Sequence, residues 1–97
     1  MEQSPQKTTK RTVDQKAVLL NRLKRIEGQI RGLARLVETD TYCNDILQQS
    51  ISARSALDGF NRELLGLHIR SCVSEGIKRD DDEVIDELLD TLRKLMK

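Results

Sequence analysis

One histidine and two cysteines are the residues of this chain whose types and spacing favour metal chemistry. His68 and Cys72 are four positions apart, so on a helix their side chains project from the same face, one turn apart, and can converge on one ion. Two ligands do not make a site, and the third candidate is Cys43. The residues alone leave another interpretation open, in which both cysteines are small buried hydrophobic side chains and His68 makes a local hydrogen bond.

A shared site between two chains would solve the separation of these ligands. If one helix contains all three, Cys43 lies roughly 37 Å from His68 along its axis, so one chain cannot bring them together. Antiparallel pairing of this helix with its copy in a second subunit would place Cys43 of one chain beside His68 and Cys72 of the other, with two equivalent sites per dimer.

The donor set favours a soft metal ion over a catalytic role. Two thiolates and one imidazole suit Cu(I), whereas Zn(II) would normally take a fourth ligand and Ni(II) would need further donors to complete a square plane. The sequence shows no acid–base pair and no base close to Cys43, so an enzyme is not expected.

Helices are predicted to position these residues. Aromatic residues make up only 2% of the chain, and the apolar residues fall at helical spacing. A first long helix is predicted to start at Thr12 or Asp14, because an apolar heptad stripe runs through Leu19, Leu23, Ile26, Ile30, Leu33 and Val37. Residues 38–41 are turn formers. A second long helix is predicted from about Tyr42 to Gly76, and a short third helix over residues 83–96.

The predicted fold class is therefore all-α, with two long antiparallel helices and a short third helix in each subunit. A chain of 97 residues cannot cover the apolar faces of such long helices, so assembly with further subunits is expected. Residues 1–12 are polar and predict a disordered basic arm, and residues 13–97 predict a single helical domain.

Charge is distributed unevenly along the chain. The net charge is only +1, but residues 1–35 contain nine Lys and Arg against three acidic residues. This asymmetry favours a local polyanion-binding face. The sequence contains no apolar run that could span a bilayer and no signal peptide, so a cytoplasmic protein with reduced cysteines is expected.

Several segments, in the same order, resemble the copper-sensitive operon repressors, the CsoR family. These segments are NRLKRIEGQIRG at 21–32, the pair Tyr42-Cys43, DILQQSISARSAL at 45–57, the His-x-x-x-Cys motif at 68–72 and DELLD at 86–90. The resemblance begins at about residue 16. It implies an antiparallel dimer and a dimer-of-dimers tetramer, which binds operator DNA when metal-free and is released when Cu(I) binds.

The resemblance also assigns roles by position. Cys43 matches the ligand from one subunit, and His68 and Cys72 match the pair from its partner. Tyr42 and Glu87 match residues that are linked to the ligand histidine and orient its ring. The sequence contains no helix-turn-helix. Phosphate contacts are therefore expected from cationic side chains, foremost Arg22, Lys24, Arg25 and Arg54, with Arg31 and Lys78 as further candidates.

The ligand residues used by other members of the family exclude some of the possible signals but do not decide between all of them. The nickel and cobalt sensors use an additional histidine near the N-terminus, and His68 is the only histidine here. Formaldehyde sensors lack a cysteine matching Cys72, and persulfide sensors lack a histidine matching His68. A cyanobacterial type of nickel sensor has a similar donor set. Alternatives to a copper repressor are thus a Ni(II) sensor, a sensor of reactive sulfur species that cross-links Cys43 and Cys72, and a metal-buffering protein without a DNA role.

Overall fold

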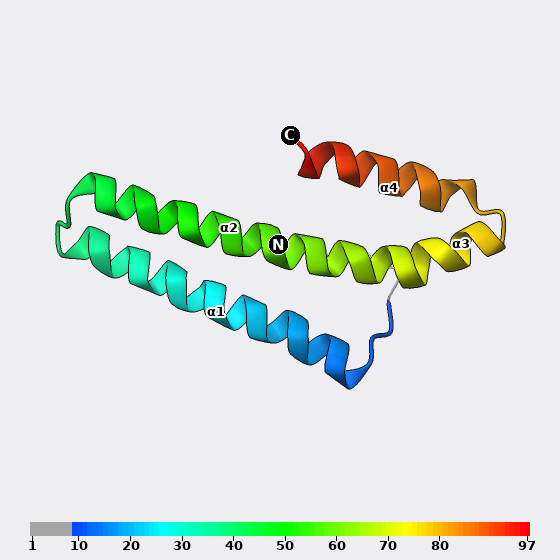
Figure 1. Cartoon of the computed structure of the whole chain (residues 1–97), viewed down its shortest axis with the longest axis horizontal. Helices are drawn as coiled ribbons and strands as arrows, with labels where there is room; N and C mark the ends of the chain where they lie inside the picture. Colours follow the sequence, from blue (N-terminus) through cyan, green and yellow to red (C-terminus); the bar gives the residue numbers. More distant parts are fainter. Residues whose placement is uncertain (1–8) are drawn as a thin grey trace, which may run out of the picture. The chain divides into compact units, whose positions relative to one another are not determined.

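The computed structural model describes residues 9–97, which form helices joined by two short turns (Figure 1). The elements are α1 (Val13–Glu38), α2 (Cys43–His68), a π-helical segment (Ile69–Val73), α3 (Ser74–Lys78) and α4 (Asp82–Leu95). Residues 9–97 contain no strand, and the predicted all-α class is confirmed. Most of the predicted basic arm falls on residues 1–8, which lie outside the described residues, and the division into an arm and one domain remains a prediction.

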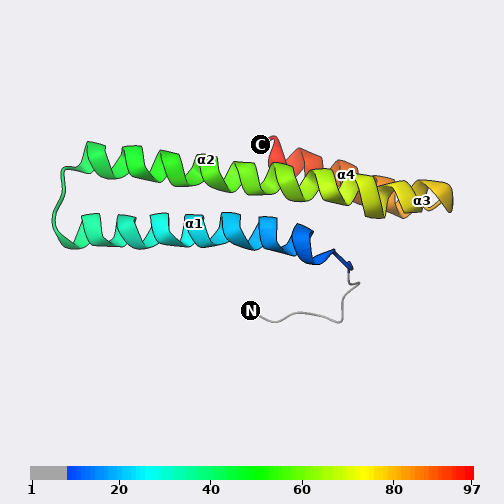
Figure 2. The same cartoon turned by 60° about the horizontal axis from the view of Figure 1, so that its bottom comes forward.

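Contacts divide the chain into two compact units, Met1–Glu63 and Leu64–Lys97. In the first unit, α1 runs antiparallel to the neighbouring part of α2 (Figure 2). α1 begins with a capping box, in which the Thr12 hydroxyl accepts a hydrogen bond from the Gln15 amide (3.0 Å) and the Gln15 side chain accepts one from the Thr12 amide (2.9 Å). The sequence allowed either Thr12 or Asp14 as the cap, and Thr12 takes this role.

Both turns between helices use an aspartate in the left-handed conformation. Asp40 has a φ of 55° and Asp80 a φ of 54°, a region that Asp tolerates better than most residues. The amide of Thr41 donates to the carbonyl of Leu36 (3.0 Å), and the amide of Asp81 donates to that of Gly76 (2.8 Å). These bonds close α1 and α3 by the same motif, in which the residue after the left-handed one bonds back to the last helical turn.

The second predicted helix continues past its expected end. It runs through the π-helical segment and α3 to Lys78, so the predicted end at Gly76 is wrong. Gly76 is buried inside α3, and a Cβ added there would lie 2.8 Å from Cβ of Val84 on α4. The glycine therefore permits close packing of α4 on α3, and Asp80 provides the left-handed stop.

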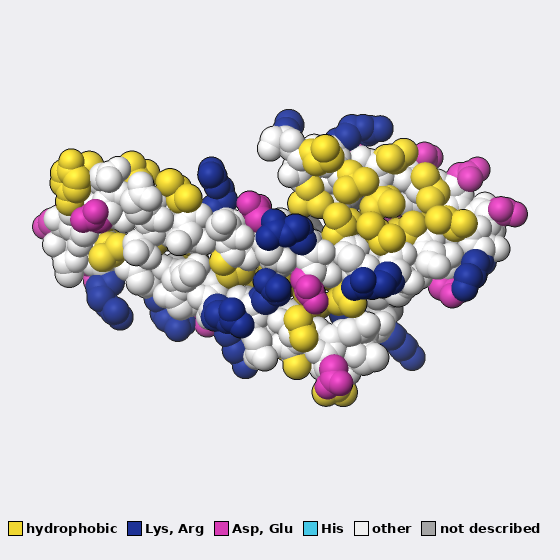
Figure 3. All heavy atoms as spheres, viewed as in Figure 1, with side chains coloured by type: hydrophobic (Ala, Val, Ile, Leu, Met, Phe, Trp, Pro, Cys, Tyr) yellow, Lys and Arg dark blue, Asp and Glu magenta, His cyan; other side chains and the backbone are white. Residues whose placement is uncertain are grey.

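The hydrophobic core is thin in both units. Leu19 and Ala53 are the buried hydrophobic residues described in the first unit, and Val73 is the one in the second. Hydrophobic side chains gather on the surface over α4 and the neighbouring α3 (Figure 3). Further large hydrophobic residues are exposed along α1 and α2, among them Leu23, Ile30, Val37, Leu47, Ile51 and Leu57.

Candidate metal centre

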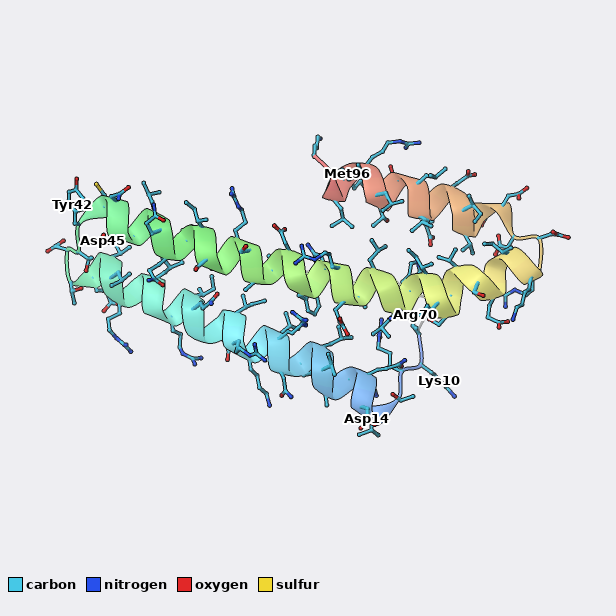
Figure 4. The ribbon with its side chains drawn as sticks, viewed as in Figure 1. Lys10, Asp14, Tyr42, Asp45, Arg70 and Met96 are labelled. Carbon is cyan, nitrogen blue, oxygen red and sulfur yellow. The ribbon has the colours of Figure 1, made fainter. Side chains whose placement is uncertain are left out.

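Cys43 is the first residue of α2, and its thiol is free and exposed. Its position follows from the turn at Asp40, after which the carbonyl of Tyr42 accepts the first helical hydrogen bonds from Asp45 and Ile46 (3.0 and 3.3 Å). The Tyr42 side chain is 70% exposed and lies at the start of α2 (Figure 4). Cys43 and Tyr42 are thus both available on the surface of one subunit.

His68 is the last residue of α2, and Cys72 lies in the π-helical segment that follows. Both side chains are partly buried, and Cys72 forms no disulfide with the other described cysteine. The Ser71 hydroxyl donates to the carbonyl of Leu67 (2.7 Å) and lies 3.7 Å from Sγ of Cys72. The sequence places His68 and Cys72 one α-helical turn apart, but the intervening backbone has the wider turn of a π-helix, a feature often found at functional sites.

One chain does not assemble the three predicted ligands. Cys43 and His68 are the two ends of a helix of 26 residues, which is about 39 Å long. Within residues 9–97, no group of three or more His, Cys, Asp or Glu side chains is placed to hold a metal ion. The single subunit therefore offers one thiol at the start of α2 and an imidazole–thiol pair after its end.

Glu87 lies on α4, the helix that packs on the π-helical segment and α3. The Glu87 side chain is exposed but is not without an interaction partner. Glu87 therefore belongs to the element that packs against the backbone carrying Cys72. The predicted link from Tyr42 and Glu87 to His68 stays a prediction.

The four leading candidates for DNA contact all lie in the first unit. Arg22, Lys24 and Arg25 are on α1, and Arg54 is on α2. Lys and Arg side chains lie over both helices on the face shown in Figure 3. All but Arg22 are exposed. The two weaker candidates have local partners, since Arg31 pairs with Glu27 (3.1 Å) and Lys78 with Glu75 (3.8 Å).

Sequence reasoning missed one contact in this group. Nη2 of Arg22 lies 4.0 Å from Oε2 of Glu63, an ion pair between α1 and α2. Both residues flank the apolar stripes of their helices, so the heptad pattern placed them at the edges of the hairpin but did not give the register that brings them together.

The model of one protein family, described as metal-sensitive transcriptional repressor, matches residues 15–94. The chain belongs to this family of metal-sensitive transcriptional repressors. Its members are regulators and not enzymes, which agrees with the sequence-based expectation. Within the family, the chain is 45% identical to the copper-sensing transcriptional repressor CsoR of Bacillus subtilis over 84 residues, which cover 86% of this chain and 83% of the relative. It is 33% identical to the CsoR of Mycobacterium tuberculosis over 86 residues, which cover 88% of this chain and 72% of that one.

Two solved structures of metal-sensing regulators are similar to this metal-sensitive repressor. The crystal structure of the copper-sensing repressor CsoR with Cu(I) from Geobacillus thermodenitrificans gives a TM-score of 0.85 at 36% identity and covers 93% of this chain and 95% of that one. The nickel-responsive transcriptional regulator InrS gives a TM-score of 0.70 at 29% identity and covers 91% of this chain and 97% of that one. Among residues 9–97, no helix has the length and apolar character required to cross a membrane.

Proposed function

We propose that this chain is a Cu(I)-responsive transcriptional repressor, which binds operator DNA in the metal-free state and releases it when Cu(I) binds. The proposal rests on one observation, which is that a chain of this family contains two cysteines and one histidine that could bind a metal ion. This metal-sensitive repressor has a cysteine at the start of α2 and a histidine and a second cysteine at and just after its end, and it has relatives that sense copper. Thiolates and imidazole are ligands that Cu(I) accepts in a three-coordinate site.

The metal site is proposed to form between two subunits. Because Cys43 and His68 are separated by the whole length of α2, antiparallel pairing of two α2 helices would bring Cys43 of one chain to His68 and Cys72 of the other at both ends of a dimer. Tyr42 and Glu87 are proposed to orient the imidazole through its second nitrogen. Bound Cu(I) would supply a bond between subunits that the metal-free protein lacks.

The exposed hydrophobic surface supports association. With so few hydrophobic side chains buried in one chain, a stable fold needs a partner that covers the stripes on α1 and α2. We propose an antiparallel dimer and a dimer-of-dimers tetramer. A protein that regulates transcription in this way acts in the cytoplasm of its cell, where its thiols stay reduced.

DNA is proposed to contact the cationic side chains of α1 and α2. Lys24, Arg25 and Arg54 are exposed, and Arg22 is held at the edge of the hairpin. Repetition of this group in each subunit of a tetramer would neutralise several phosphates along a duplex. A shift in the relative positions of the subunits when metal binds would misalign the group and weaken the complex, and a coupling free energy of about 1–3 kcal/mol is enough for such a switch.

Nickel is the second candidate signal, favoured by the similarity to InrS. An anisotropy titration distinguishes the metals. A labelled duplex, selected by the metal-free protein from a random-sequence library, is titrated with the protein anaerobically, alone and with one equivalent of Cu(I) or Ni(II).

The metal-free protein should bind the selected duplex, and Cu(I) should weaken binding by about 5- to 150-fold. Weakening by Ni(II) and not by Cu(I) would assign the protein to nickel sensing. Failure to bind any duplex in either state would contradict a repressor and favour a metal-buffering protein.

A further inference from the structure

The ion pair between Arg22 and Glu63 points to a role for a carboxylate on the proposed DNA-binding face. We propose that Glu63 holds the Arg22 side chain in the DNA-free protein and competes with a DNA phosphate for it, so that Glu63 sets how tightly the repressor binds. This inference rests on the proposed function, because it concerns the same DNA contact.

The backbone of α2 is shaped for this contact. Gly59 lies one helical turn before Glu63, and a Cβ added to it would lie 3.0 Å from Nη1 of Arg22. The guanidinium therefore lies over the bare backbone at Gly59 and reaches from there to Glu63. A larger residue at position 59 would have to displace the Arg22 side chain.

This ion pair also differs from the others in the described chain. Across residues 9–97, the other ion pairs join residues three or four positions apart on the same helix or in one short segment. Lys24, Arg25 and Arg54 form no ion pair with any described residue. Of the four leading cationic candidates, Arg22 alone is therefore partnered by a carboxylate of residues 9–97.

The contact is weak enough to be exchanged. The Arg22 and Glu63 side chains are 40% and 38% exposed, and their closest charged atoms are 4.0 Å apart. Ion pairs of this exposure contribute little to stability. A phosphate can accept two hydrogen bonds from one guanidinium, so it can replace Glu63.

Glu63→Gln tests the proposal, because it removes the charge and keeps the shape of the side chain. In the anisotropy titration with the selected duplex, Glu63→Gln should bind about twofold to fivefold more tightly than the wild type, the range expected for loss of an exposed ion pair. Arg22→Ala should bind more weakly. In the Arg22→Ala background, Glu63→Gln should give no gain, because the competition no longer exists.

Asp58→Asn is the matched control. Asp58 is an exposed carboxylate on the same helix with no ion pair among the described residues, so its removal changes net charge equally and leaves Arg22 alone. Its effect on DNA affinity should be smaller than that of Glu63→Gln. Helical circular dichroism and the thermal midpoint of each variant check that folding is unchanged.

Three results would overturn the role of Glu63. These are unchanged or weaker binding by Glu63→Gln, an equal gain from Asp58→Asn, and an equal gain in the Arg22→Ala background, which would show general charge repulsion. Each presupposes that the wild-type protein binds the duplex. If the wild type does not bind, the proposed function fails instead, so the two failures are distinguishable.

Discussion

Mixing two inactive variants tests whether the metal site is shared between chains. Cys43→Ser removes the proposed ligand at the start of α2, and His68→Ala removes the proposed ligand at its end. Each variant alone should lack a complete site, because every site in its homodimer has lost one ligand. In a mixed dimer one site loses both ligands, while the other combines the intact Cys43 of one chain with the intact His68 and Cys72 of the other.

The expected recovery follows from two-fold symmetry. At equal concentrations and random pairing, half of the dimers are mixed, and each mixed dimer keeps one of its two sites. The mixture should therefore bind about one quarter of the Cu(I) that the same amount of wild-type protein binds. Association of dimers into tetramers does not change this fraction.

The assay is an anaerobic Cu(I) titration against a chromophoric chelator, after the two variants have been unfolded together and refolded. Each variant refolded alone provides the baseline, and wild-type protein defines full capacity. A mixture with no more high-affinity copper than its components would refute the shared site. Substantial high-affinity binding by either variant alone would show that its missing residue is not a required ligand.

The remaining predictions concern the switch, the DNA contact and the packing of α4. His68→Ala should bind the duplex as the wild type does but fail to release it with Cu(I), and release at the wild-type copper concentration would contradict its role as a ligand. Arg54→Ala should weaken binding and reduce the slope of log affinity against log salt by about one, and an unchanged slope would remove Arg54 from the phosphate contacts. Gly76→Ala should lower the free energy of unfolding by about 1–3 kcal/mol, because its Cβ collides with Val84. Urea unfolding measures this loss, and an equally stable Gly76→Ala protein would show that α4 moves freely on α3.

Much of the fold could be predicted from the sequence because its signals are local. The apolar stripe from Leu19 to Val37 specifies the length of α1, and the Thr12 cap and the turn at Asp40 specify its ends. The sequence predicted that the second helix ends at Gly76, but α3 continues to Lys78, because a glycine can have either of two structural roles. A glycine can end a helix or let another helix approach closely, and only the position of Val84 decides between them.

The candidate site was less accessible to sequence reasoning. The types and spacing of Cys43, His68 and Cys72 indicate metal chemistry, but the π-helical backbone between the last two leaves no signal in the residues themselves. The contact between Arg22 and Glu63 depends on the register of α1 against α2, which side-chain packing sets over long distances in sequence. Local patterns therefore predict the candidate ligands, and tertiary packing decides how the residues around them are held.

The small hydrophobic core of the subunit links the amount of folded regulator to the level of its expression. If the proposed assembly covers the exposed stripes, a chain with so few buried hydrophobic residues would gain much of its folding free energy by association, and its folded fraction would rise with its own abundance. When synthesis falls, isolated chains would then unfold and be degraded, and the amount of folded regulator would fall more steeply than the amount made. The level of expression would then help to determine how much metal is needed before the controlled genes are transcribed.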